Sequence, residues 1–402
     1  MLVKRIVIGG YGLLCSVGLG SFLGGFYLLQ GTLIHLVGLG TTWRPVFNAA
    51  WLLLIGGLIY LVQSTTGQLP RPLGLIRADL AHTGTTNYRY LLLQLVIPAL
   101  ILTSGTSLGP EATLVSTTVL GGVWLAEKQR WLTLHWQDGK RAILKAMAVP
   151  HRALQPRPAT STASWWSPLV LAELAAGCFA FYLTCKFGGE PSVLVLLGRA
   201  HWGLREWAWL LPVFLAGRLV GRLELRLMVM LRRLVLGRVR RQASLLLLGG
   251  LAIYAASLWL PAINYSGMAN FHLLAGSWQH QSATFLIAAA LAKLALVTLC
   301  LNTGWIGGDI FPVLFCATAQ GIALSQFLPA DAVFVIAVFA ISAGGTILEA
   351  PLVAGGVMGI MFLPPNLLGI CALVTLGLWL ADRKQHLLLV DWVHQWAGLL
   401  AK

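Results

Sequence analysis

Long apolar segments alternate with short polar ones along almost the whole chain. Several of the apolar segments are long enough to cross a hydrocarbon core of about 30 Å, and others are short or interrupted by glycine and proline. The pattern predicts an all-α polytopic membrane protein built from tilted and broken helices. The apolar segments are 6–34, 46–63, 90–125, 166–186, 191–200, 206–236, 245–262, 283–302, 307–329, 332–348, 351–363 and 366–381.

Two polar segments interrupt or follow this pattern. The segment 127–164 is expected to be a polar loop with room for one amphipathic helix, and 383–402 a C-terminal tail that could form a surface helix. Both are too short for a separate soluble domain. A single membrane domain over 1–402 therefore accounts for the chain. Its start is expected to be a retained first helix, because the apolar segment 6–34 is longer than the roughly 7–15-residue core of a signal peptide.

The charge of the chain changes this picture little. Of 402 residues, 57% are hydrophobic and 10% charged, and the net charge is +15. The basic residues gather in a few loops, as the positive-inside rule describes, so we expect no nucleic-acid partner. We expect a multi-pass protein of the plasma membrane (the inner membrane of a bacterium) with both termini cytoplasmic. The largest cluster, opposed only by Glu224, is Arg218, Arg222, Arg226, Arg232, Arg233, Arg238, Arg240 and Arg241.

The six cysteines lie in apolar segments without metal or redox spacing, and no cofactor is expected.

The sequence divides into two halves, 1–186 and 206–382, and each has a glycine-rich break followed by a helix. The breaks are 105–113 and 304–312. Paired breaks in two halves point to a substrate site between repeats near the membrane midplane. Helix N-termini there expose N–H groups and partial positive charge, which bind anions.

Glu111 is a lone acid in the first break, directly after Gly109 and Pro110. Burying such an acid at membrane depth costs at least about 2.5 kcal/mol, which makes a function the default hypothesis. A carboxylate in the first helical turn could occupy an anion site and leave it on protonation, as a gate. It could also serve only as a first-turn acid that complements the helix dipole.

The second half makes a family resemblance specific. The chain resembles the CLC family of chloride channels and chloride/proton antiporters, whose signatures are Gly-Arg-Glu-Gly-Pro, Gly-Gly-x-Phe-x-Pro and an Ala-Pro-Leu helix start. The segments 109–113, 307–312 and 350–352 fall on these three signatures. The loop 266–271 and Lys293 match further family positions. The resemblance implies a CLC-type inverted repeat without cytoplasmic regulatory domains, and a homodimer.

The same resemblance assigns roles to residues of both breaks. Glu111 falls on the external gating glutamate, and the backbone amides of Asp309 and Ile310 on those that hold the central anion. Asp309 itself is expected to be an N-cap whose carboxylate accepts an N–H two or three residues on. Thr113, in place of a proline, is similar to the fluoride-exporting branch. The residues implied in anion binding are Gly109, Pro110, Gly308, Asp309, Ile310, Phe311, Gly67 and Gln68.

Three departures limit what transfers. The family's inner Gly-Ser-Gly-Ile-Pro has a poor counterpart in 66–70, with Gly67 or Gln68 near the serine's place. No tyrosine is present in 387–390, where the family has a coordinating one. The internal proton-transfer glutamate, counted from the helix start Ser167-Pro-Leu, falls on Cys178. Glu173 lies five residues earlier. Its interpretation as a buried, paired polar group is at least as well supported as a role as a proton relay.

The implied function is transport of small inorganic anions, chloride foremost, either channel-like or coupled to protons, with flux rising as external pH falls. An intramembrane serine protease is the rival, because Ser107 lies in a Gly-x-Ser-x-Gly pattern. It would need a base from His35, His272 or His280. The hydrolase motif also requires a β-strand before the serine, and an isolated strand cannot exist in the hydrocarbon region of a membrane. A non-transporting subunit whose glycines serve helix packing is the third reading.

Overall fold

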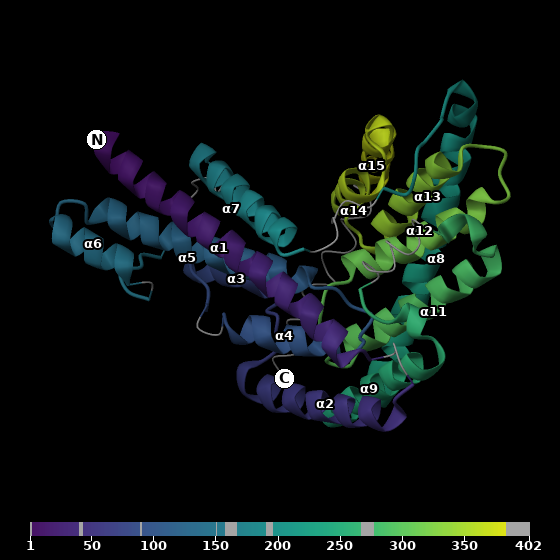
Figure 1. Ribbon diagram of the computed structural model, residues 1–402, viewed down its shortest axis with the longest axis horizontal. Coiled ribbons are helices and arrows are strands. Elements are labelled where there is room, and N and C mark those ends of the chain that lie inside the picture. Colours follow the sequence, from purple (N-terminus) through teal and green to yellow (C-terminus); the bar gives the residue numbers. More distant parts are fainter. Residues whose placement is uncertain are drawn as a thin grey trace. The chain divides into compact units, whose positions relative to one another are not determined.

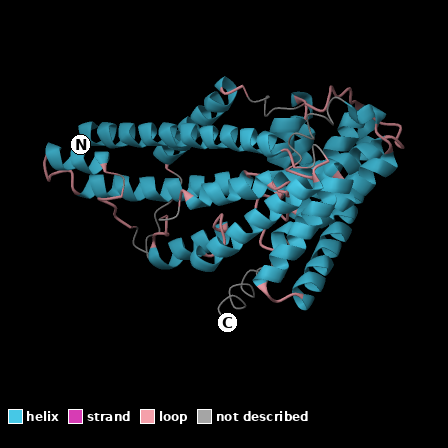
Figure 2. Ribbon diagram, turned by 60° about the horizontal axis from the view of Figure 1, so that its bottom comes forward, coloured by secondary structure: helices cyan, strands magenta, loops and turns pink. Residues whose placement is uncertain are grey.

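The computed structural model describes residues 2–39, 43–88, 91–149, 151–156, 167–189, 196–266 and 277–382. Within these ranges the regular elements are helices, as Figure 2 shows. Six are long and apolar enough to cross a membrane, which confirms the predicted all-α, multi-pass architecture. They are α1 (Leu2–Val37), α2 (Pro45–Thr66), α7 (Pro168–Phe187), α9 (Gln242–Trp259), α11 (Ala283–Asn302) and η4 with α15 (Pro365–Asp382).

Shorter apolar helices confirm that several segments are broken. They are α4 (Leu93–Thr103), α12 (Ile310–Ser325), α13 (Ala332–Ile347) and α14 (Pro351–Val357) with η3 (Met358–Phe362). The apolar run 90–125 divides into α4 and α5 (Glu111–Leu134) at the first break. In the run 191–200, the described residues 196–200 form no helix. The loop 266–271, apart from Ser266, and the tail 383–402 lie outside the described residues.

The chain folds into two compact units that do not follow the two sequence halves. The first takes Met1–Leu36, Gln68–Ala99 and Ala112–Pro191, and the second takes Val37–Gly67, Leu100–Glu111 and Ser192–Lys402. In the first unit, α1, α4, α5 and α7 share an apolar cluster of buried side chains. It comprises Leu23, Phe26, Leu95 and Ala99, with Leu19, Leu114 and Phe181 packed against them.

The second unit is built around α12 and α13, which lie side by side (Figure 1). Nearly every residue of both helices is buried. Their sequences are apolar on all faces, as expected of helices surrounded by protein. The helices α8 (Leu204–Arg238) and α11 pack on this pair, and α2 lies beside α9. This unit contains residues 105–111 of the first glycine-rich break and all of the second, 304–312.

The helix α8 approaches α13 at two glycines. A Cβ built on Gly221 would lie 2.7 Å from the carbonyl oxygen of Ala343, and one on Gly217 2.9 Å from that of Phe339. Neither position has room for a side chain unless the helices separate. Close backbone approach through small residues is the usual way in which membrane helices pack.

The arginine cluster was predicted to be a loop, and this is wrong for most of it. Six of its eight members lie within α8, whose 35 residues span about 52 Å at 1.5 Å per residue. A helix of that length can carry an apolar part and a basic end without a break. Arg218 pairs with Asp382 of α15 at 2.8 Å.

The predicted polar loop 127–164 also contains more helix than expected. The helix α5 continues to Leu134, and α6 runs over Lys140–Ala148. Leu132 is fully buried, in a cluster with Ile143 of α6, so apolar residues within the polar stretch stabilise both helices. Residues 157–164 lie outside the described residues.

Candidate functional site

The two breaks have the same construction. The helix before each break ends at Thr103 or Asn302, and the second residue after that end is a glycine with positive φ. Gly105 has φ 72° and Gly304 has φ 93°, a region that side chains rarely tolerate. The next helix begins at Glu111 or at Ile310, six residues after the glycine in both cases. This confirms the predicted pair of glycine breaks that open directly into helices.

The breaks are joined to each other by backbone hydrogen bonds. The N–H of Gly109 donates to the carbonyl of Gly308 at 2.8 Å, and the N–H of Gly308 donates to the carbonyl of Gly109 at 2.7 Å. The two glycines thus form an isolated antiparallel bridge. Segments that lie about two hundred residues apart in the sequence are held in register at this point.

The side chain of Glu111 binds the start of α12. Its Oε1 accepts the backbone N–H of Phe311 at 2.9 Å, and the residue is 7% exposed. At this helix start Pro312 has no N–H, and Val313 already donates to the carbonyl of Asp309. The amides left to bind an acceptor are therefore those of Asp309, Ile310 and Phe311. A helix N-terminus of this kind favours negatively charged groups, and here the Glu111 carboxylate lies against it.

Both bridging glycines make room for that carboxylate. A Cβ on Gly109 would lie 1.8 Å from Oε2 of Glu111, and one on Gly308 would lie 2.5 Å from its Cδ. The Oε2 atom is buried and has no hydrogen-bond partner among the described residues. The glutamate side chain therefore fills a space that exists because two neighbouring positions carry no side chain.

The expected capping bond of Asp309 is wrong. Asp309 stands at the N-cap position of α12, but its side chain makes no capping hydrogen bond. The nearest acceptable donor, the N–H of Phe311, is taken by Glu111 from the other break. The sequence predicts the amides of Asp309 and Ile310 as anion donors and includes Phe311 among the anion-binding residues, but it does not indicate that the Phe311 N–H binds Glu111. Pro312 was the sequence signal for this role of Phe311. Because proline has no N–H, it leaves Phe311 as the donor two residues after Asp309.

The structure brings part of the predicted site together. Gly109, Glu111, Gly308 and Phe311 are in direct contact, Pro110 directly precedes α5, and Ile310 is the first residue of α12. Gly67 is not part of this group. It ends α2 with φ 78°, and a Cβ built there would meet nothing within 4 Å.

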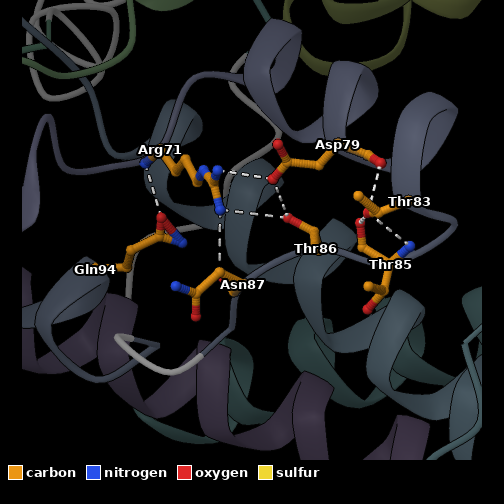
Figure 3. A network of polar contacts seen from close by, with 7 residues as sticks. All are labelled: Arg71, Asp79, Thr83, Thr85, Thr86, Asn87 and Gln94. Carbon is orange, nitrogen blue, oxygen red and sulfur yellow. Dashed lines mark hydrogen bonds and ion pairs between the residues drawn. The ribbon is translucent and has the colours of Figure 1, made fainter.

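Gln68 is exposed and belongs to the first unit, where a polar network follows it (Figure 3). The backbone N–H of Arg71 donates to Oε1 of Gln94 at 2.7 Å, and its guanidinium pairs with Asp79 at 2.7 Å. The same guanidinium reaches Thr86. The network ties the segment after Gln68 to α3 (Leu73–Thr83) and α4.

The remaining predicted helix starts are confirmed. The helix α14 begins at Pro351 after Ala350, and α7 begins at Pro168, with the hydroxyl of Ser167 accepting the N–H of Val170. Glu173 accepts a hydrogen bond from Gln129, as a paired polar group would. Among the described residues no group of histidine, cysteine or acidic side chains could hold a metal ion.

The comparisons with known proteins identify the family of the chain. A family model described as "Voltage gated chloride channel" matches residues 159–382, more than half of the chain. The chain belongs to this family, the CLC family. A search of curated protein sequences gives no match.

Two solved structures share the fold. One is the crystal structure of a CLC-type fluoride/proton antiporter, with TM-score 0.65 and 15% identity over 94% of this chain and 96% of that one. The other is a slow cyanobacterial Cl⁻/H⁺ antiporter, with TM-score 0.66 and 19% identity over 96% and 98%. They confirm the predicted CLC-type membrane fold.

Membership in a family of transport proteins also confirms that the chain is not an enzyme. The rival serine protease is excluded with it. Ser107 is fully buried, and its hydroxyl has no hydrogen-bond partner within the described part of the chain. A nucleophilic serine would need a base at hydrogen-bonding distance.

Proposed function

We propose that the protein carries small inorganic anions, chloride foremost, across a membrane through a pathway that Glu111 gates. The observation that carries this proposal is the hydrogen bond from the Phe311 N–H to the Glu111 carboxylate. An inorganic anion would use the same donor group, so the carboxylate and the anion compete for it.

Protonation decides the competition. Hydrogen bonds to a charged acceptor contribute about 1.5–3 kcal/mol, against about 0.5–1.5 kcal/mol for a neutral one. A proton on Glu111 removes about half of this attraction, and it also removes the charge that repels the anion. The side chain then leaves the helix start, and an anion takes its place on the amides of Ile310 and Phe311. Each opening of the gate therefore consumes a proton at one carboxylate.

Channel-like and proton-coupled transport both remain consistent with this gate. The two solved relatives are antiporters by their titles, which supports protons as a second substrate. Cys178 stands where the family has its internal glutamate, and Glu173 is held by Gln129. These two observations favour loose coupling or channel-like flux over strict exchange.

The placement in the cell is part of the proposal. Lys4 and Arg5 at the start of α1 and the arginines of α8 indicate, by the positive-inside rule, a plasma or bacterial inner membrane with both termini cytoplasmic. Family resemblance supports a homodimer with one pathway in each subunit. The only support for voltage dependence is the description of the matching family model, "Voltage gated chloride channel".

Reconstitution into liposomes with an anion gradient tests the proposal. Anion efflux and proton uptake are recorded together for chloride, fluoride and nitrate. We expect wild-type flux of at least one anion, and faster, pH-independent flux for Glu111→Ala. Asp138→Asn, which removes an exposed acid between α5 and α6, serves as the matched control and should behave as wild type. No flux of any anion from folded protein would overturn the proposal.

A further inference from the structure

The backbone around Asn264 is held on both sides. Lys293 of α11 is fully buried, and its ammonium group donates to the carbonyl of Ile263 at 2.9 Å and to that of Tyr265 at 2.8 Å. Tyr265 has φ 62° and donates its hydroxyl to the carbonyl of Leu39 at 2.7 Å. Positive φ is costly for a tyrosine and persists only where the surroundings enforce it. The position of Asn264 is thus fixed before any ligand binds.

The side chain of Asn264 points into the first break. A Cβ built on Gly105 would lie 3.3 Å from its Nδ2, so the amide lies against the glycine with positive φ. The residue is 1% exposed, and neither Nδ2 nor Oδ1 has a hydrogen-bond partner among the described residues. Leaving a buried amide unpaired is expensive, and such a group calls for a ligand, water or ion to satisfy it.

Ser107 supplies a second buried polar group nearby. Its hydroxyl is fully buried and, within the described part of the chain, has no partner. It stands two residues after Gly105, so their Cα atoms lie within about 7 Å. The thiol of Cys300, on the same helix as Lys293, lies near the backbone N–H of Ser107. The helix α11 therefore lies beside both groups.

The donors of these two groups match an anion. The amide offers two N–H donors and the hydroxyl offers one, while Oδ1 of the amide needs a donor in return. We propose that Asn264 and Ser107 bind a small anion that keeps part of its hydration shell, at a site separate from the Phe311 amide. The N–H and O–H groups donate to the anion, and Oδ1 accepts a hydrogen from its water. A side chain at Gly105 would be strained by the positive φ and would crowd the Asn264 amide, because its Cβ would lie 3.3 Å from Nδ2.

This inference rests on the proposed function, since the ligand is the transported anion. The test uses the full-length protein in detergent, titrated with chloride and with fluoride by isothermal calorimetry, beside liposome flux measured over a range of anion concentrations. Asn264→Leu removes the amide at similar size. We expect the apparent affinity for the anion to fall roughly tenfold, the effect of one lost hydrogen bond to a charged group. Ser107→Ala should give a loss in the same direction.

Asn48→Leu is the matched control. Asn48 is as buried as Asn264, but its amide donates to Ser257, so its loss should leave anion affinity unchanged. If Asn264→Leu does not fold, Asn264→Asp replaces it, because a carboxylate has no N–H donor and repels an anion.

The outcomes separate this inference from the proposed function. Unchanged affinity in the Asn264 and Ser107 variants, with normal wild-type flux, would overturn the second site and leave the Glu111 pathway standing. A rise in thermal stability of Asn264→Leu without a change in affinity would show a purely structural asparagine. Absence of wild-type flux would count against the Glu111 pathway. The anion affinities of wild type and variants, measured by calorimetry, would still test the Asn264 site.

Discussion

The Oε1 atom of Glu111 lies 2.9 Å from the backbone nitrogen of Phe311, two hundred residues further along the chain. The donor is a main-chain group at a helix start, so the contact does not depend on the identity of the phenylalanine side chain. The acceptor is a side chain that can lose its charge. The contact therefore responds to protons through Glu111 alone, and this gives the first prediction.

Glu111→Gln should make anion flux insensitive to external pH. In the wild type, lowering the pH protonates the carboxylate, weakens its bond to Phe311 and raises flux. The glutamine is neutral at every pH, so we expect flux near the wild-type acid level, roughly tenfold above wild type at neutral pH. Liposome efflux recorded at several external pH values measures this. A wild type with equal flux at high and low pH would contradict the gate.

Gly308→Ala should displace the Glu111 side chain without protonation. The added methyl group would lie 2.5 Å from the carboxyl carbon, and the neighbouring backbone is bridged to Gly109. We expect raised flux at neutral pH and a weaker pH dependence. Gly356→Ala is the control, because nothing lies within 4 Å of that position. The same efflux assay compares the two, and equal behaviour would show that the carboxylate has room to move elsewhere.

Lys293→Met should destabilise the protein. The substitution removes the donor for two buried carbonyls, those of Ile263 and Tyr265, and this costs about 1–3 kcal/mol per group left unpaired. Thermal unfolding in detergent should show a lower midpoint than wild type. Lys145→Met, at an exposed position of α6, should leave the midpoint unchanged.

Gly221→Ala should loosen the contact between α8 and α13. The new methyl group would face backbone atoms of Ala343 at 2.7 and 3.0 Å, which cannot rotate away. Overpacking of this kind costs about 1–3 kcal/mol. Gly237→Ala, on the same helix with nothing within 4 Å, should be neutral or stabilising by about 0.5–1 kcal/mol. Unfolding midpoints of the two variants that fall together would contradict the close approach.

The sequence predicted the site best where local chemistry decides the structure. Glycine and proline positions determined where the breaks end and where α5, α12 and α14 begin. Glu111 was found because an isolated acid in an apolar segment is costly wherever it lies. The three family signatures fall on the same positions, 109–113, 307–312 and 350–352.

What the sequence did not predict depends on contacts over long distances. Asp309 has the residue type and position of an N-cap, yet the donor it would use is taken by a residue from another part of the chain. The arginines of α8 were expected in a loop because clustered charges usually lie outside a membrane span. The helix α8 is longer than the hydrocarbon core, so one helix contains both the apolar residues and most of the arginines. Asn264 gave no signal at all, since an asparagine after a proline-led turn is common and only its burial makes it unusual.

The bridge between Gly109 and Gly308 restricts how the pathway can open. Two reciprocal main-chain bonds couple the breaks, so one break cannot move away without breaking both bonds to the other. Rotation of a single glutamate side chain needs no such rupture. Gating would then be a local rotamer change, which proteins make within picoseconds to nanoseconds when unhindered, and its observed rate would be set by the arrival of protons rather than by helix movement.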